Sequence, residues 1–237
     1  MLKLDEALVQ FKLDILKRAM PARSAVVFGD MYIVEGGYTA ACLELGCEWA
    51  LLVDSLETPN WQNLRIKYPA LDFYKGDFSN HLFMKSFNRT FDIGVLYDIV
   101  LHQAPLLNTL HLMLEKVRDK VCIVQPMLIE QQHPNSLVYL PGNTAHKELY
   151  PMGDWDKEYL AFDVKAVNQC NWIWGMTISF LTSVLQGEGF EITYQEKLGD
   201  MPNNSWFWWG CVAERKSHNP QHWANTGMLP GLQSPSW

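Results

Sequence analysis

Residues 25–54, AVVFGDMYIVEGGYTAACLELGCEWALLVD, decide the fold class. The stretch opens with a short apolar run at 25–29, passes a pair of glycines and a helical segment, and returns to a second apolar run at 49–53 that ends at Asp54. Short buried runs separated by helices are typical of a parallel sheet that is covered by helices. The stretch therefore predicts a strand, a helix and a second strand of an α/β protein.

The same alternation continues along the chain. Three further apolar runs predict strands at 71–74, 91–96 and 121–124. Apolar residues at helical spacing predict helices over 4–19, 38–45, 105–116 and 176–185. Two later runs, 190–195 and 206–213, flank a turn-rich segment and predict an antiparallel hairpin. Together these elements predict a Rossmann-like, doubly wound α/β fold with a seven-stranded sheet.

Two segments fall outside this regular pattern. Residues 127–175 contain several prolines and glycines and are too long for a plain loop, so we expect a lid or binding insertion after the fifth strand. Residues 217–237 are rich in Asn, Pro and Ser, and we expect them to be a tail that packs on the domain. We therefore predict one domain over 1–216, followed by that tail.

Composition narrows the class of protein further. The chain has 237 residues, with 26 acidic and 19 basic side chains and a formal net charge of −7, which disfavours binding to polyanions. Charged residues make up 19%, below the roughly 25% of an average soluble domain, so a large core is expected. Eight of the ten tryptophans lie after residue 150. The five cysteines form no C-x-x-C pair, and no apolar run is long enough for a membrane span. We expect a cytoplasmic protein without disulfides, metal or membrane contact.

Polar and glycine residues follow the predicted strands where a doubly wound sheet binds its ligand. Gly36 and Gly37 precede a helix, where a ligand can approach the backbone closely. Asp54 ends the second strand and is placed to accept both hydroxyls of a ribose, and Asp77 follows the third strand, where an acid can reach an adenine amino group. This pattern predicts a nucleoside-containing cofactor. Turn and helix-cap roles for the same residues are an alternative of about equal weight.

The pattern of residues 22–214 resembles the class I methyltransferases that use S-adenosylmethionine (SAM). Within them it is most similar to the family of the tRNA wobble-uridine carboxymethyltransferase, which uses carboxy-SAM. Three stretches carry the likeness: 98–106 (DIVLHQAPL), 140–143 (LPGN) and 172–177 (WIWGMT). The family's aromatic and basic neighbours of the histidine are replaced by Leu101 and Gln103, so ordinary SAM is the expected ligand.

Other departures from that family change the expected substrate. Its long N-terminal extension is missing, and the chain has no basic stripe, so we expect a small-molecule substrate and no nucleic acid. The glycine loop at 28–37 is longer than the usual one and lacks its middle glycine, which leaves Asp30 or Glu35 to hold the SAM ammonium. The predicted cofactor contacts are Gly29, Asp30, Glu35, Gly36, Gly37, Asp54, Ser55, Asp77, Phe78 and Tyr97.

A second set of residues is predicted to carry the chemistry. His102 follows the fourth strand and is the candidate base, with a role in tying down the next turn as the alternative. Aromatic rings of the insertion and the hairpin could stabilise a sulfonium by cation–π attraction, although a place in the aromatic core is the favoured alternative for each ring taken singly. By strand alternation Trp206 and Trp208 share one face, and Phe207 and Trp209 share the other. The predicted catalytic residues are His102, Tyr139, Asn143, Trp174, Thr177 and Ser205.

Three functions follow from this reading. The first is methyl transfer from SAM to a small molecule. The second is a cyclase of the azetidine-2-carboxylate synthase type, in which the α-amine of SAM attacks its own γ-carbon and releases methylthioadenosine. The third is a non-catalytic subunit with a degenerate methyltransferase fold. The sequence leaves open whether the protein forms a homodimer.

Overall fold

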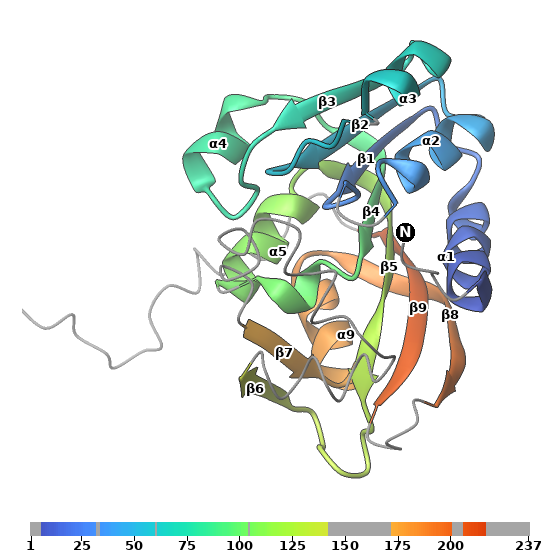
Figure 1. Cartoon of the computed structure of the whole chain (residues 1–237). Helices are drawn as coiled ribbons and strands as arrows, with labels where there is room; N and C mark the ends of the chain where they lie inside the picture. Colours follow the sequence, from blue (N-terminus) through green and yellow to red (C-terminus); the bar gives the residue numbers. More distant parts are fainter. Residues whose placement is uncertain are drawn as a thin grey trace, which may run out of the picture.

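The computed structural model describes residues 6–31, 34–59, 61–103, 105–141, 172–200 and 206–216. Its centre is a seven-stranded sheet in the order β3-β2-β1-β4-β5-β9-β8 (Figure 1). The strands are β1 (Ser24–Phe28), β2 (Trp49–Asp54), β3 (Leu71–Lys75), β4 (Phe91–Tyr97), β5 (Val117–Leu128), β8 (Phe190–Asp200) and β9 (Trp206–Arg215). Strands β1 to β5 are parallel, and β9 runs antiparallel to both β5 and β8. The predicted fold class and the closing hairpin are confirmed.

Strand β1 lies in the middle of the sheet and shows why both faces are covered. Ala25 and Val27 pack into one hydrophobic cluster, and Val26 and Phe28 pack into another on the opposite face. All four side chains are at most 1% exposed. A strand that is buried on both sides needs a continuous apolar run, and residues 25–28 provide it.

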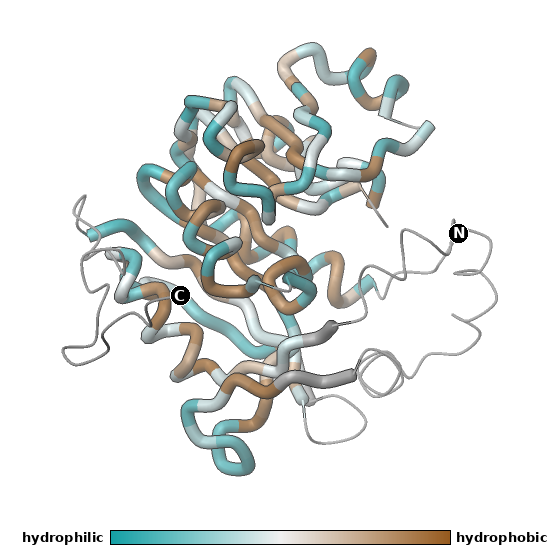
Figure 2. Tube along the Cα trace, turned by 90° about the vertical axis from the view of Figure 1, so that its left-hand side faces the viewer, coloured by the Kyte–Doolittle hydropathy of each residue, from teal (hydrophilic) through white to brown (hydrophobic). Residues whose placement is uncertain are grey.

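Helices cover both faces of the sheet (Figure 1). Helices α1 (Glu6–Ala19), α2 (Gly37–Glu44) and α3 (Trp61–Lys67) lie on one face, and α4 (His81–Ser86), α5 (Leu106–Leu114) and α9 (Ile178–Gly187) lie on the other. The tube in Figure 2 shows the apolar strands enclosed between these helices. Among the helices of the described residues, none has the length and apolar character to cross a membrane.

Strand β5 is longer than the sequence predicts. The expected strand ended at Val124 because Gln125 and Pro126 interrupt the apolar run, but the observed strand continues to Leu128. Strand β4 ends at Tyr97, opposite Val124, so beyond this point β5 pairs only with β9. The missing N–H of Pro126 therefore breaks no hydrogen bond to β4.

The predicted insertion begins and ends with paired strands. Strands β6 (Leu137–Pro141) and β7 (Trp172–Met176) form a separate antiparallel pair. Residues 142–171, which would form the body of the lid, and the tail 217–237 lie outside the described residues. The lid and the packing of the tail stay predictions, as does the division into one domain and a tail.

Candidate functional site

The candidate site lies where the strand order reverses, between the carboxyl ends of β1 and β4. This is the position at which doubly wound sheets bind ligands. Gly29 follows β1 with φ of 71°, and a Cβ at this position would lie 2.5 Å from Cδ1 of Ile99, in the segment after β4. The two strand ends therefore approach so closely that only glycine fits at position 29.

Asp30 connects the loop after β1 to helix α2. Its Oδ2 accepts hydrogen bonds from the backbone N and Oγ1 of Thr39, both at 2.7 Å, and Oδ1 accepts from the backbone N of Tyr38 at 3.4 Å. Asp30 thus satisfies N–H groups in the first turn of α2. Burial raises the pKa of this carboxyl to about 7, against the opposing effect of these hydrogen bonds.

The remaining residues of the predicted glycine loop shape the turn before α2. Glu35 and Gly36 both have positive φ, 52° and 87°, and the N–H of Gly36 donates to the carbonyl of Asp30 at 2.9 Å. Gly37 is the first residue of α2. Contact of this turn with a ligand, and of Asp30 or Glu35 with an ammonium, stays a prediction.

Asp54 ends β2 beside this loop and is 7% exposed. Its Oδ2 accepts from the backbone N of Met31 and its Oδ1 from the backbone N of Leu56, both at 2.9 Å. Burial raises the pKa of the carboxyl, and these backbone donors oppose the rise. The backbone N–H of Ser55 is a third donor to this carboxylate, which can accept about four hydrogen bonds, so about one acceptor position remains. The neighbouring Ser55 is exposed.

The two predicted cofactor contacts after β3, Asp77 and Phe78, differ in burial. Asp77 is exposed, and its Oδ1 accepts from the backbone N and Oγ of Ser79 at 2.8 and 2.6 Å. Phe78 is 7% exposed and packs edge-on against Phe28, with ring centroids 5.8 Å apart. Asp77 thus forms its own turn, and a contact of either residue with adenine stays a prediction.

Beside the carboxyl end of β4 lies a group that the sequence analysis did not single out, here named the Lys12 cluster: Lys12, Tyr38, Tyr97, Asp98 and Trp208. The ammonium of Lys12 lies 2.5 Å from Oδ2 of Asp98. It also lies 5.4, 6.0 and 5.7 Å from the ring centres of Tyr38, Tyr97 and Trp208. A buried cation is therefore held by one carboxylate and three aromatic rings.

Two polar atoms of the Lys12 cluster are left without hydrogen bonds. Oδ1 of Asp98 and the hydroxyl of Tyr38 are buried and have no hydrogen-bond partner in the described structure. Burial raises the pKa of Asp98, whereas the charge of Lys12 lowers it. Burial and the charge of Asp98 both raise the pKa of Tyr38. Asp98 also has φ of 55°, an uncommon conformation for a residue with a side chain.

The predicted cofactor contact Tyr97 belongs to this cluster. Its hydroxyl donates to the backbone carbonyl of Lys12 at 2.8 Å, and its ring packs edge-on against Tyr38 with centroids 5.1 Å apart. Tyr97 thereby fixes α1 against the end of β4. A direct contact of Tyr97 with the cofactor stays a prediction.

Helical spacing could have identified Lys12. It lies four residues after Leu8 and three before Ile15, on the face of α1 that the apolar residues define. That face is buried, so a lysine on it requires a partner. Asp98 is the first residue after β4. The sequence analysis included Asp98 only within the stretch 98–106, as part of the resemblance to a family, and gave it no role.

The predicted catalytic residues are only partly described. His102 ends a short 3₁₀ helix (Val100–His102) after β4 and is half-buried. The indole N–H of Trp174 donates to the carbonyl of Gln103 at 2.8 Å, so β7 is tied to the same segment. Thr177 is fully buried, and its Oγ1 accepts from the backbone N of Ser136 at 3.0 Å and caps α9. The side chain of Tyr139, and Asn143 and Ser205, lie outside the described residues.

Phe207, Trp208 and Trp209 of the hairpin alternate between the two faces of the sheet as predicted. Trp208 packs in the cluster that contains α1, whereas Phe207 and Trp209 pack in the cluster on the other face. Trp206 is 1% exposed and lies against Gly175 of β7. Of these aromatic residues, Trp208 is therefore the one that reaches the Lys12 cluster.

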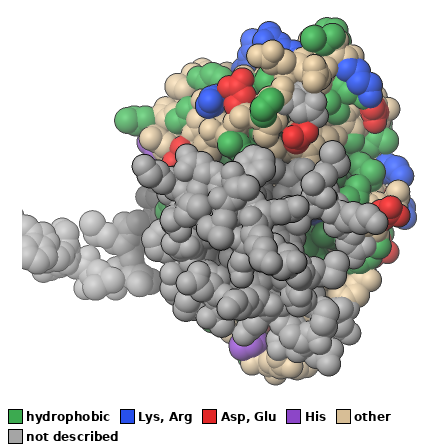
Figure 3. Space-filling model, viewed as in Figure 1, with side chains coloured by type: hydrophobic (Ala, Val, Ile, Leu, Met, Phe, Trp, Pro, Cys, Tyr) green, Lys and Arg blue, Asp and Glu red, His purple; other side chains and the backbone are tan. Residues whose placement is uncertain are grey.

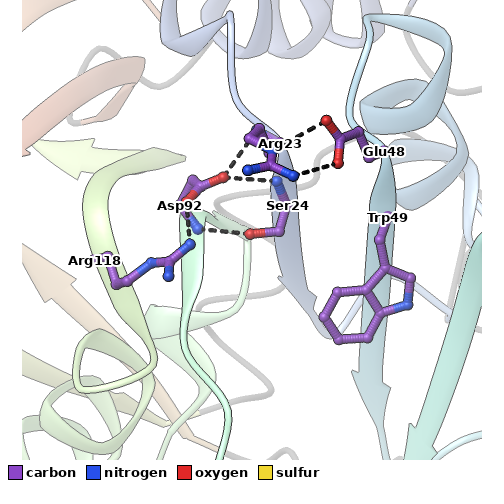
Figure 4. A pocket seen from close by; sticks show the side chains of 6 residues that line it. All are labelled: Arg23, Ser24, Glu48, Trp49, Asp92 and Arg118. Carbon is purple, nitrogen blue, oxygen red and sulfur yellow. Dashed lines mark hydrogen bonds and ion pairs between the residues drawn. The ribbon is translucent and has the colours of Figure 1, made fainter.

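A separate cavity of about 300 Å³ lies at the amino ends of the strands, at the end of the sheet opposite the candidate site (Figure 4). Arg23 pairs with both carboxylate oxygens of Glu48, each at 3.0 Å. Asp92 accepts from the backbone N of Arg23 and of Ser24, and it also pairs with Arg118. These charged groups satisfy one another and hold the first residues of the central strands together. We assign this cavity a structural role.

Comparisons with known proteins define the fold. No protein-family profile matches the sequence, and no curated protein sequence is similar to it. Several solved structures are similar in fold. One is the 1,6-didemethyltoxoflavin-N1-methyltransferase of Burkholderia thailandensis with bound 1,6-didemethyltoxoflavin and S-adenosylhomocysteine (SAH). Its TM-score is 0.62 at 15% identity, with 90% of this chain and 80% of that chain covered.

Two other methyltransferases are similar at lower scores. The magnesium protoporphyrin IX methyltransferase of Synechocystis PCC 6803 with bound SAH has a TM-score of 0.53 and 11% identity, over 87% of this chain and 83% of that chain. The N-methyltransferase NodS of Bradyrhizobium japonicum WM9 has a TM-score of 0.54 and 9% identity, over 91% of this chain and all of that chain. These likenesses, together with the strand order, show that this chain has the Rossmann-like fold of class I SAM-dependent methyltransferases.

Proposed function

We propose that this protein is a SAM-dependent methyltransferase that acts on a small molecule. The observation that carries the proposal is the position of Asp54 beside the glycine loop, at the reversal point of a methyltransferase-type sheet. The similar structures support it, because they include methyltransferases of small molecules with bound SAH. In this proposal SAM supplies an electrophilic methyl group on a sulfonium.

The residues at the site fit the nucleoside part of SAM. Asp54 accepts three backbone hydrogen bonds and retains capacity for about one more, which suits a hydroxyl of a ribose. The positive φ of Gly29 and Gly36 lets the backbone turn tightly beside it. The first turn of α2 already has two of its N–H groups taken by Asp30. We therefore place the ribose at Asp54 and the sulfur toward the end of β4.

A small acceptor is favoured over nucleic acid. Nucleic acid binds proteins largely because basic side chains release the counterions of its phosphates, and a net charge of −7 disfavours such binding. On the face in Figure 3, acidic and basic side chains of the described residues are interspersed. The Lys12 cluster adds three aromatic rings, packed around a buried ion pair, next to the end of β4. Such an environment excludes water from an electrophile.

Incubation of the purified protein with SAM, followed by mass spectrometry, tests the proposal. We expect SAH to form only when an acceptor is added, from a set of small amines, phenols and carboxylic acids. Methylthioadenosine and a four-membered amino acid, formed from SAM alone, would instead support the cyclase. Absence of binding of both SAM and SAH in calorimetry would support the non-catalytic subunit.

A further inference from the structure

The Lys12 cluster contains a charged group whose hydrogen bonding is incomplete. Asp98 uses Oδ2 for Lys12, but Oδ1 has no partner, and the hydroxyl of Tyr38 nearby has none either. An unsatisfied buried polar atom costs free energy, so two in one cluster need an explanation. The left-handed backbone of Asp98 adds strain, which persists mainly at functional sites.

One side of the Lys12 cluster reaches the surface. The side chain of Lys12 is 5% exposed and that of Asp98 is 25% exposed, so Asp98 lies closer to the surface than the ammonium does, although Oδ1 of Asp98 is itself buried. Asp98 is held there from two sides, because its backbone N donates to the carbonyl of Val124 at 2.9 Å and its Oδ2 binds Lys12. A fixed acceptor at the end of β4 is suited to orient a second molecule.

We propose that Asp98 and Tyr38 bind the nucleophilic group of the acceptor, an uncharged hydroxyl or amine carried on an apolar body. This inference rests on the proposed methyl transfer. The O–H or N–H of the acceptor donates to Oδ1 of Asp98, and the hydroxyl of Tyr38 donates to the same oxygen or nitrogen. Lys12 is a positioning residue, since it keeps Asp98 ionised and in place without contacting the acceptor.

Asp98 then serves as the proton acceptor of the reaction. The acceptor's oxygen or nitrogen forms a bond to the methyl carbon while the carbon–sulfur bond breaks and its electron pair stays on sulfur. The acceptor's proton passes to Oδ1 of Asp98 and from there to water. Asp98 therefore takes the role that the sequence analysis gave to His102, which follows four residues later in the same segment.

This assignment is tested by measuring whether the protein binds a ligand that can donate a hydrogen bond more tightly than one that cannot. Binding of phenol and of anisole, and of aniline and of N,N-dimethylaniline, is measured by ligand-observed NMR with SAH present. We expect phenol or aniline to bind about tenfold tighter than its methylated partner, which cannot donate. Asp98→Asn should remove this preference, because its amide oxygen replaces Oδ2 at Lys12 and leaves an N–H where Oδ1 was. Asparagine also tolerates the left-handed backbone.

Controls separate the possible failures. Glu48→Gln makes the same carboxylate-to-amide change in an exposed ion pair at the opposite edge of the sheet, and should keep the preference. Tyr38→Phe should weaken binding of phenol and anisole alike without unfolding the chain, because the oxygens of both accept from the Tyr38 hydroxyl. If SAH fails to bind the unaltered protein, the proposed function is wrong and this inference is wrong with it. If SAH binds but phenol and aniline do not, or Asp98→Asn keeps the full preference, only the inference is overturned.

Discussion

The ammonium of Lys12 lies 2.5 Å from the carboxylate of Asp98, although 86 positions separate the two residues in the sequence. Helix α1 supplies one partner, and the first residue after β4 supplies the other. The pair thus connects the amino-terminal helix to the edge of the sheet where the candidate site lies.

Removal of one partner should destabilise the protein. In Lys12→Met the carboxylate of Asp98 loses its counter-charge and the rings of Tyr38 and Trp208 lose a cation, so we expect a loss of about 3 kcal/mol in the free energy of unfolding. The double variant Lys12→Met with Asp98→Asn should recover part of this loss, because no unpaired charge remains. Urea unfolding measures both. A single variant as stable as the unaltered chain would show that the pair is not formed.

Gly29 should tolerate no side chain. In Gly29→Ala the new methyl group meets Cδ1 of Ile99 at 2.5 Å and φ is 71°, so we expect a loss of about 2–4 kcal/mol from overpacking and strain together. Gly46 is the matched control, because its φ is 107° but no atom lies within 4 Å of the added Cβ. Gly46→Ala should therefore cost only the strain. Equal thermal stability of the two variants would contradict the close approach of β1 and β4.

The stability of the protein should fall as the pH rises through the titration of His111. Its Nδ1 lies 2.9 Å from the carboxylate of Glu188, and this hydrogen bond raises the pKa of His111 above 6.5. A raised pKa in the folded state means that the stabilisation is fully present below about 6.5. It is lost as the pH increases through the raised value.

The variant His111→Gln isolates this effect. It lacks the titrating group, so its free energy of unfolding should change less than that of the unaltered chain between pH 6 and pH 8, about the range in which histidines titrate. Urea unfolding at several pH values provides the comparison. Parallel pH profiles for the two proteins would show that the contact between α5 and Glu188 does not carry the dependence.

The sequence predicted the elements of the sheet far better than the contacts at its edge. A strand that is buried on both faces needs a continuous apolar run such as 25–28, so it can be recognised from the sequence alone. Asp30 or Glu35 was predicted to hold the SAM ammonium, and the structure adds that Asp30 accepts hydrogen bonds from the first turn of α2. A carboxylate after a strand suits both roles, so its contacts with the helix could not be predicted from the sequence. The pairing of Lys12 with Asp98 likewise depends on how α1 packs, which no local pattern encodes.

The account depends most directly on Asp54 as the ribose ligand. Calorimetric titration of SAH into the unaltered protein and into Asp54→Ala tests this role. Loss of the hydrogen bonding of the ribose to a charged acceptor should weaken binding by about 100-fold. Because Asp54 also accepts from the backbone of Met31 and Leu56, circular dichroism must show that the variant is folded. Unchanged affinity for SAH in a folded Asp54→Ala variant would contradict the account.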